Sequence, residues 1–141
     1  MSVTRWLVDT NVVSELRKGR RTDAAVRDWY AKTTEESLFT SVLVLSEIRR
    51  GIELKRRRDP LSAASLDRWL RTIIVAYADH VLPIDQAVAE DWGHLDARGP
   101  FPVIDGLLAA TARVHGLTVV TRNVKDFGRL DVEVVDPFTS P

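Results

Sequence analysis

The sequence lacks cysteine and has no long apolar run, and each absence excludes a class of protein. Without cysteine there are no disulfides, no thiolate metal sites and no cysteine nucleophile. No stretch approaches the roughly 18 apolar residues of a membrane-spanning helix. Asp9 interrupts the first apolar segment too early for a signal peptide. We therefore expect a cytoplasmic protein with no membrane partner.

The sequence also lacks an excess of charge of either sign. It has 20 Lys and Arg residues and 20 Asp and Glu residues, so its formal net charge is zero. Any binding to nucleic acid has to be argued from local clusters of charge. With 141 residues, 45% of them hydrophobic, the chain is long enough to bury a core. It contains no repeat or linker, and we expect residues 1–141 to form one domain.

Short apolar runs alternate with segments of helical periodicity along the chain. Strands are expected near residues 6–8, 37–40, 80–84, 117–121 and 132–135, the last of them at an edge of the sheet. Strands that alternate with helices form a parallel sheet covered on both faces. The sequence therefore predicts an α/β fold around a mostly parallel sheet of about five strands.

Polar residues and glycine mark the expected helix boundaries. Three residues are predicted N-caps, namely Thr22, Ser41 and Asp85, and Ser62 is predicted to start a further helix. Asp105 is expected to open a helix that ends at Gly116, and Asp126 is expected in a loop. The helix after Ser41 starts apolar on nearly all sides, so we expect that end to be buried. With no strand between them, the two helices of residues 41–76 are predicted to form a hairpin that stands off the sheet.

Four acidic residues are expected to gather at one edge of the sheet. Asp9 ends a buried strand, Asp105 starts an apolar helix, and Asp126 follows the turn after a later strand, while Glu47 lies in the helix that follows another strand. Clustered carboxylates repel one another, and a divalent cation such as Mg²⁺ removes that cost. A carboxylate-bound Mg²⁺ suits metal-assisted hydrolysis of a phosphodiester.

Each acidic residue also has a structural explanation. Asp105 can serve as an N-cap, Glu47 can pair with a neighbouring arginine, and Asp126 is ordinary in a loop. Four polar residues near the acids also have two interpretations. They either form turns or orient the carboxylates by hydrogen bonds. They are Thr10, Asn11, Thr121 and Asn123.

Four segments of the chain together resemble the PIN-domain ribonucleases, in particular VapC- or FitB-like toxins of bacterial type II toxin–antitoxin pairs. The matching segments are residues 7–12, 46–51, 104–112 and 120–127, and they span essentially the whole chain. The resemblance implies a three-layer α/β/α sandwich and Mg²⁺- or Mn²⁺-dependent endoribonuclease activity. It also implies a homodimer and inhibition by a small VapB- or FitA-like antitoxin, through which alone DNA would be bound.

Carried over residue by residue, Asp9, Glu47 and Asp105 match the first three acids of the family. The resemblance implies that Asp9 and Asp105 bind the metal directly. Many relatives have aspartate where this chain has Asn123. Either Asp126 completes the site, or a second metal is held weakly.

Basic and aromatic residues leave several interpretations open. The densest positive run comprises Arg49, Arg50 and residues 55–58. It suits the phosphates of RNA, an acidic segment of an antitoxin, or simply a solvated helix face. Three tryptophans on apolar helical stripes are interpreted as core or dimer contacts rather than as platforms for stacking bases, and Trp6 is interpreted as core; the three are Trp29, Trp69 and Trp92. The three histidines are scattered, which argues against a zinc site.

Two other functions remain as alternatives. The first is a phosphoryl-transfer domain with Asp9 as its nucleophile, although Asn11 stands where a haloacid-dehalogenase phosphatase would carry its second aspartate. The second is a catalytically silent PIN scaffold that acts only through a partner. Trapping of a covalent aspartyl-phosphate would favour the first, and failure to cut RNA with Mg²⁺ or Mn²⁺ would favour the second.

Overall fold

A computed structural model describes residues 3–139 of the chain, and its centre is one parallel sheet. The strands lie in the order β3-β2-β1-β4-β5. Their bounds are β1 Trp6–Val8, β2 Leu38–Ser41, β3 Val81–Leu82, β4 Thr118–Val120 and β5 Val134–Val135. Leu7 stands in register with Phe39 on one side and with Val119 on the other. The prediction of an α/β fold around about five parallel strands is confirmed, and β5 lies at an edge.

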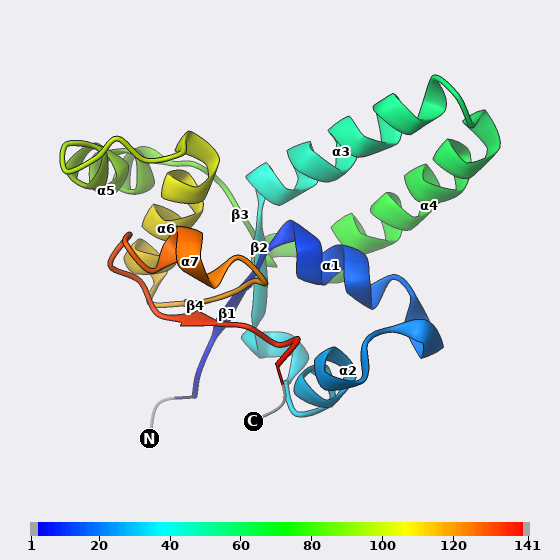
Figure 1. The fold of residues 1–141 in the computed structure, drawn as a ribbon, viewed down its shortest axis with the longest axis horizontal. Helices are drawn as coiled ribbons and strands as arrows, with labels where there is room; N and C mark the ends of the chain where they lie inside the picture. The colour runs from blue at the N-terminus through cyan, green and yellow to red at the C-terminus, as the bar shows by residue number, and fades with distance from the viewer. Residues whose placement is uncertain (1–2, 140–141) are drawn as a thin grey trace.

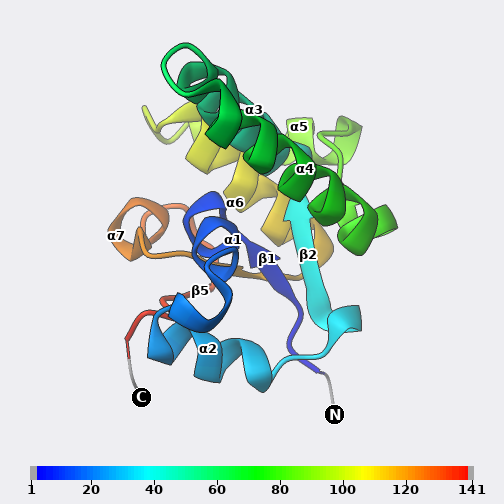
Figure 2. The same cartoon turned by 90° about the vertical axis from the view of Figure 1, so that its right-hand side faces the viewer.

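Helices cover both faces of this sheet. They are α1 Thr10–Leu16, α2 Ala24–Ala31, α3 Val42–Arg56, α4 Pro60–Tyr77, α5 Gln86–Asp96, α6 Val103–His115 and α7 Val124–Phe127. Figure 1 shows α5 and α6 on one side of the sheet and α1, α2 and α4 on the other. Figure 2 shows the hairpin of α3 and α4 above the sheet and α2 below it. The three-layer arrangement and the projecting hairpin match the predictions.

The core forms between the sheet and the two helical layers. Leu7, Val8 and Val120 are fully buried because helices lie on both faces of their strands. On α6, Ala109 and Ala110 have no exposed surface, so this helix lies close against the sheet. Gly116 ends α6 with φ 68°, in the left-handed region that glycine adopts without strain, as predicted.

Two of the three predicted N-caps are confirmed, and the third is wrong by one residue. Ser41 and Asp85 cap α3 and α5. In place of Thr22, Asp23 caps α2 by accepting hydrogen bonds from the first-turn amides. The Thr22 hydroxyl is engaged elsewhere, because it donates to the Glu15 carbonyl at 3.1 Å.

The predicted start of α4 is also wrong, because this helix begins before Ser62. Asp59 is the N-cap, and its carboxylate accepts hydrogen bonds from the Ser62 amide at 3.2 Å and the Ser62 hydroxyl at 2.7 Å. Pro60 occupies the first turn of α4, where its fixed φ suits a helix and no amide hydrogen bond is lost. Asp59 and Pro60 together therefore start α4.

Two further expectations are corrected. The first turn of α3 is not buried on all sides, because Val42 is 39% exposed and only Val44 in that turn has no exposed surface. Since α3 projects from the sheet edge, only one of its faces meets the core. Asp126 lies in the short helix α7 rather than in a loop.

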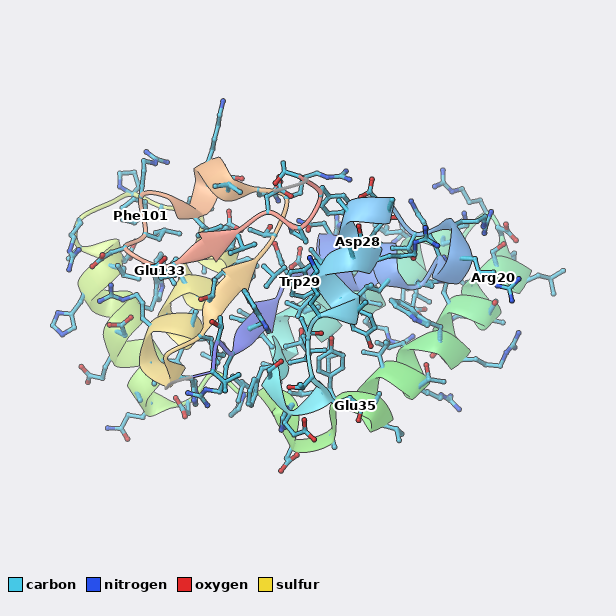
Figure 3. All side chains as sticks on the ribbon, turned by 90° about the horizontal axis from the view of Figure 1, so that it is seen from below. Arg20, Asp28, Trp29, Glu35, Phe101 and Glu133 are labelled. Carbon is cyan, nitrogen blue, oxygen red and sulfur yellow. The ribbon has the colours of Figure 1, made fainter. Side chains whose placement is uncertain are left out.

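The tryptophans pack against the core without being fully buried, in agreement with their interpretation as core contacts. Figure 3 shows Trp29 beneath the sheet, seen from below, with Arg20 and Phe101 near opposite ends of the molecule. The Trp29 ring meets the Trp6 ring edge to face at 5.6 Å between centroids. None of the helices within residues 3–139 combines the length and apolarity that crossing a bilayer requires.

Candidate active site

Asp9 is fixed at the carboxyl end of the central strand β1. Its amide donates to the Val120 carbonyl at 3.0 Å and extends the pairing of β1 with β4. One carboxylate oxygen, Oδ1, accepts the Thr10 amide at 2.8 Å, so Asp9 is also the N-cap of α1. The other oxygen, Oδ2, accepts the Thr121 hydroxyl at 2.8 Å. The side chain is only 6% exposed and its orientation is held from two sides.

A network of polar side chains surrounds Asp9. The Asn11 amide nitrogen donates to the Thr121 hydroxyl at 3.1 Å and lies 3.4 Å from Asp9 Oδ2. The Asn11 carbonyl oxygen accepts the Arg122 amide at 3.1 Å. Asn123 contributes its backbone amide, which donates to the Thr121 hydroxyl at 3.1 Å. Thr121 is fully buried and joins the turn after β4 to the turn after β1.

Glu47 enters the same region from α3. The Thr10 hydroxyl donates to Glu47 Oε1 at 3.0 Å. No arginine within residues 3–139 forms an ion pair with Glu47, so the expected alternative of a salt bridge is not realised there. Thr10 thus touches two acids at once, Asp9 through its amide and Glu47 through its hydroxyl.

Asp105 lies in the first turn of α6 and does not cap it. Pro102 occupies the N-cap position, and no hydrogen bond from a helix amide to Asp105 is present in the described part of the chain. Partial burial raises the pKa of Asp105, and the charges of Asp9 and Asp126 raise it further. Asp126, on α7, is therefore close enough to act on Asp105 electrostatically.

Three of the acids, Asp9, Glu47 and Asp105, have raised pKa values. Burial raises the pKa of Asp9, and the hydrogen bonds from Thr121 and Thr10 offset part of that rise. For Glu47, loss of hydration also raises the pKa, and the charges of Asp9 and Asp105 add to it. The ionisation of each of these carboxyl groups would cost less free energy if a cation lay among them.

The donor set fits a hard divalent cation. Within residues 3–139 no three acidic or histidine side chains converge closely enough to chelate an ion by themselves. Mg²⁺ commonly takes only one or two carboxylates and completes its octahedral shell with water and phosphate oxygens. A buried, doubly oriented Asp9 beside Asp105, with repulsion between them, matches that requirement.

The basic residues considered for substrate binding differ in their surroundings. Arg49 pairs with Asp67 at 2.9 Å and with Glu53 at 3.1 Å, which ties α3 to α4. Arg56 pairs with the same two acids. Arg50 is exposed and forms no ion pair in the described chain. Arg49 and Arg56 of the basic run therefore stabilise the hairpin, and acidic residues of the hairpin neutralise their charge.

Sequence reasoning missed Gly106, which positions Asp105. A β-carbon at Gly106 would overlap the ring of Trp92 on α5. Only glycine lets α5 and α6 approach this closely, and the approach fixes the first turn of α6. The glycine follows Asp105 directly in the chain, but no local pattern identifies its distant neighbour.

The comparisons with known proteins agree with this fold. A family model described as "PIN domain" matches residues 6–133. The chain therefore belongs to the PIN domain family.

Among relatives, the VapC ribonuclease Y4jK of Sinorhizobium fredii is 32% identical over 141 residues, covering 94% of this chain and 96% of that protein. Toxin FitB of Neisseria gonorrhoeae is 29% identical, covering 94% and 97%. The structure of FitAB bound to an IR36 DNA fragment superposes with a TM-score of 0.85 at 28% identity, covering 96% and 97%.

Proposed function

We propose that this protein is an endoribonuclease that uses a divalent metal ion and acts as the toxin of a toxin–antitoxin pair. The observation that carries the proposal is the meeting of Asp9, Glu47 and Asp105 at the carboxyl edge of the sheet in a PIN-family chain. The similarity to a VapC ribonuclease and to toxin FitB, over nearly the full chain, supports it.

The residues have distinct roles in this proposal. Asp9 and Asp105 would hold the ion, Mg²⁺ or Mn²⁺, which supplies a water of lowered pKa and stabilises charge on the phosphate. Glu47 accepts a hydrogen bond from Thr10 and would orient an attacking water by its other oxygen. Asp126 is our candidate for the fourth acid because its charge acts on Asp105, while Asn123 contributes a backbone hydrogen bond.

The partners follow from the same relatives. The solved FitAB complex binds a DNA fragment. We propose that this chain likewise pairs with a small DNA-binding antitoxin, forms a homodimer and contacts DNA only through that partner. We further propose that residues 1–141 act as one PIN domain in the cytoplasm.

A cleavage assay with purified protein tests the proposal. Single-stranded RNA is incubated with protein freed of any copurified inhibitor, with Mg²⁺, with Mn²⁺, or with EDTA. We expect cutting only with a divalent ion, and no cutting by Asp105→Asn. Intact RNA under all conditions would instead support the catalytically silent scaffold. A covalent phosphate trapped on Asp9 would support phosphoryl transfer, although both Asp9 oxygens already accept hydrogen bonds.

Thr121→Val is expected to lower the cleavage rate by roughly 10- to 100-fold, the usual cost of losing a group that orients a metal ligand. Valine keeps the shape of threonine but cannot donate to Asp9 Oδ2. Thr121→Ser retains the hydroxyl and should keep most of the activity. Initial rates measured across a Mg²⁺ titration check this, since the valine variant should need more Mg²⁺. Equal Mg²⁺ dependence of the two variants would contradict the role of Thr121.

The raised pKa of Asp9 predicts a pH-dependent difference in stability between the wild type and Asp9→Asn. Below the ordinary pKa of 3.8 the wild-type carboxyl is protonated in both the folded and the unfolded state, so its ionisation does not change the free energy of unfolding. As pH rises through the raised folded-state pKa, the unfolded state ionises first, so the wild type loses stability relative to the variant. In EDTA at about pH 7.5 we therefore expect the higher Tm for Asp9→Asn.

Adding Mg²⁺ should reverse this order, because an ion bound only to the folded wild type raises its Tm. Thermal scans at acidic and neutral pH, with and without Mg²⁺, measure both effects. A wild-type Tm that does not respond to Mg²⁺ at neutral pH would count against a metal site at Asp9.

A further inference from the structure

A cavity opens directly beside Glu47, between α1 and the hairpin of α3 and α4. Its volume is about 340 Å³, which is within the usual range of ligand pockets. Thr10 and Glu47 form one end, and Trp69 lies in the wall. Figure 1 shows α1 lying alongside the hairpin, where these elements meet.

The lining of this cavity suits a flat group with a polar edge. Its apolar wall consists of Ile48, Ile52, Leu66 and Trp69. Ser14 and Thr10 add hydroxyls, and the Arg17 guanidinium lies over the Trp69 ring at 5.8 Å from its centroid. A nucleobase has an aromatic face that stacks on an indole and on a guanidinium plane.

The same two side chains also border a second cavity. Arg17 and Trp69 line a space of about 520 Å³ between α1, α2 and α4. This second cavity contains Arg27, two tyrosines and no acidic residue. Arg17 is exposed and has no ion-pair partner within residues 3–139. The two cavities, together called the groove, share Arg17 and Trp69. Away from the carboxylates the groove has positive and aromatic side chains among apolar ones, which complements a polyphosphate backbone carrying bases.

Trp69 packs against the core but is only partly buried, and it lines both cavities. We therefore propose that Trp69, with Arg17 over its ring, is more than a core contact and is a stacking platform for a base of single-stranded RNA next to the cleaved phosphate. The inference rests on the proposed function for the position of that phosphate. Glu47 and Trp69 line one cavity, so a nucleotide with its phosphate near Glu47 has its base within reach of Trp69. Arg17 then contacts either the stacked base or the adjoining phosphate.

A binding experiment in EDTA tests the platform without any cleavage. The probes are a single-stranded oligoadenylate and an oligomer of the same length made of abasic ribose phosphates. We expect oligoadenylate to quench the fluorescence of Trp69 on binding. Trp69→Ala should bind oligoadenylate roughly five- to a hundredfold more weakly and bind the abasic oligomer as the wild type does.

Three variants serve as comparisons. Trp69→Phe keeps an aromatic face and should retain most of the affinity for oligoadenylate. Arg17→Gln should weaken binding of both oligomers, whereas Arg98→Gln, just after α5 on the other side of the sheet, should leave binding of both nearly unchanged. Trp29→Phe removes a tryptophan of α2 that is not among the lining residues of either cavity, so the quenching should persist in that variant.

The outcomes separate this inference from the proposed function. Quenching and selective loss of base binding in Trp69→Ala support the platform even if the wild type never cuts RNA. Three results overturn it: no RNA binding by the wild type, unchanged affinity in Trp69→Ala, or an equal loss for the abasic oligomer. If Trp69→Ala cuts and binds RNA normally but escapes inhibition by its protein partner, the groove belongs to that partner.

Discussion

Asp9→Asn is expected to lower the rate of RNA cleavage by at least about a hundredfold while leaving the fold intact. The amide keeps the shape of the carboxylate and can still cap α1 through its carbonyl oxygen. It removes the charge that would bind a divalent ion, and losing only a group that orients such a ligand already costs roughly 10- to 100-fold. Cleavage rates of the wild type and the variant at saturating Mg²⁺ provide the measurement.

Asp28→Asn is the matched control, because it makes the same chemical change on exposed α2, beneath the sheet. Its cleavage rate should equal that of the wild type. Circular dichroism and thermal scans confirm that both variants are folded. The metal-site mechanism is wrong if Asp9→Asn cuts RNA at the wild-type rate, or if Asp28→Asn is impaired to the same degree.

The elements that could be predicted from the sequence are those set by local patterns. The buried strand Trp6–Val8, the alternation of strands with helices and the glycine at the end of α6 each depend on neighbouring residues alone. The position of Asp9 followed from the same pattern, because a polar residue directly after a buried strand must lie at the sheet edge. The parallel topology then brings the turn with Thr121 beside it.

The errors arise where several polar residues compete for one role. Thr22 and Asp23 are both good N-caps, and Asp23 takes the position because the Thr22 hydroxyl reaches back to Glu15. The first turn of α3 has an apolar sequence, yet Val42 is exposed because α3 leaves the sheet edge at that point. Neither outcome is decided by residues adjacent in the chain.

Parts of the site depend on contacts between distant residues. Thr10 links Asp9 to Glu47 across 37 positions, and the side chains of Arg17 and Trp69 meet across two helices. The pairing of Arg49 with Asp67 likewise depends on how the hairpin closes. A local pattern shows which residue types stand at such positions. Their partners are determined only by the folded structure.

Gly106→Ala is expected to lower both stability and cleavage, because its new methyl group would overlap the ring of Trp92. Alanine favours a helix over glycine by about 1 kcal/mol. Overpacking of a buried position costs roughly 1–3 kcal/mol, and relief requires α6 or the large indole to move. Movement of α6 displaces Asp105, the preceding residue. We expect a fall in Tm of several degrees and a loss of cleavage that added Mg²⁺ only partly restores.

Gly93→Ala is the matched control for this prediction. Gly93 lies inside α5, with open space where its β-carbon would stand, so the same substitution there should raise Tm slightly and leave cleavage unchanged. Combining Gly106→Ala with Trp92→Leu makes room for the methyl group, and the double variant should be more stable than the sum of the single effects predicts. If the two effects simply add, or if Gly106→Ala alone cuts RNA normally, close packing of α5 on α6 does not position Asp105.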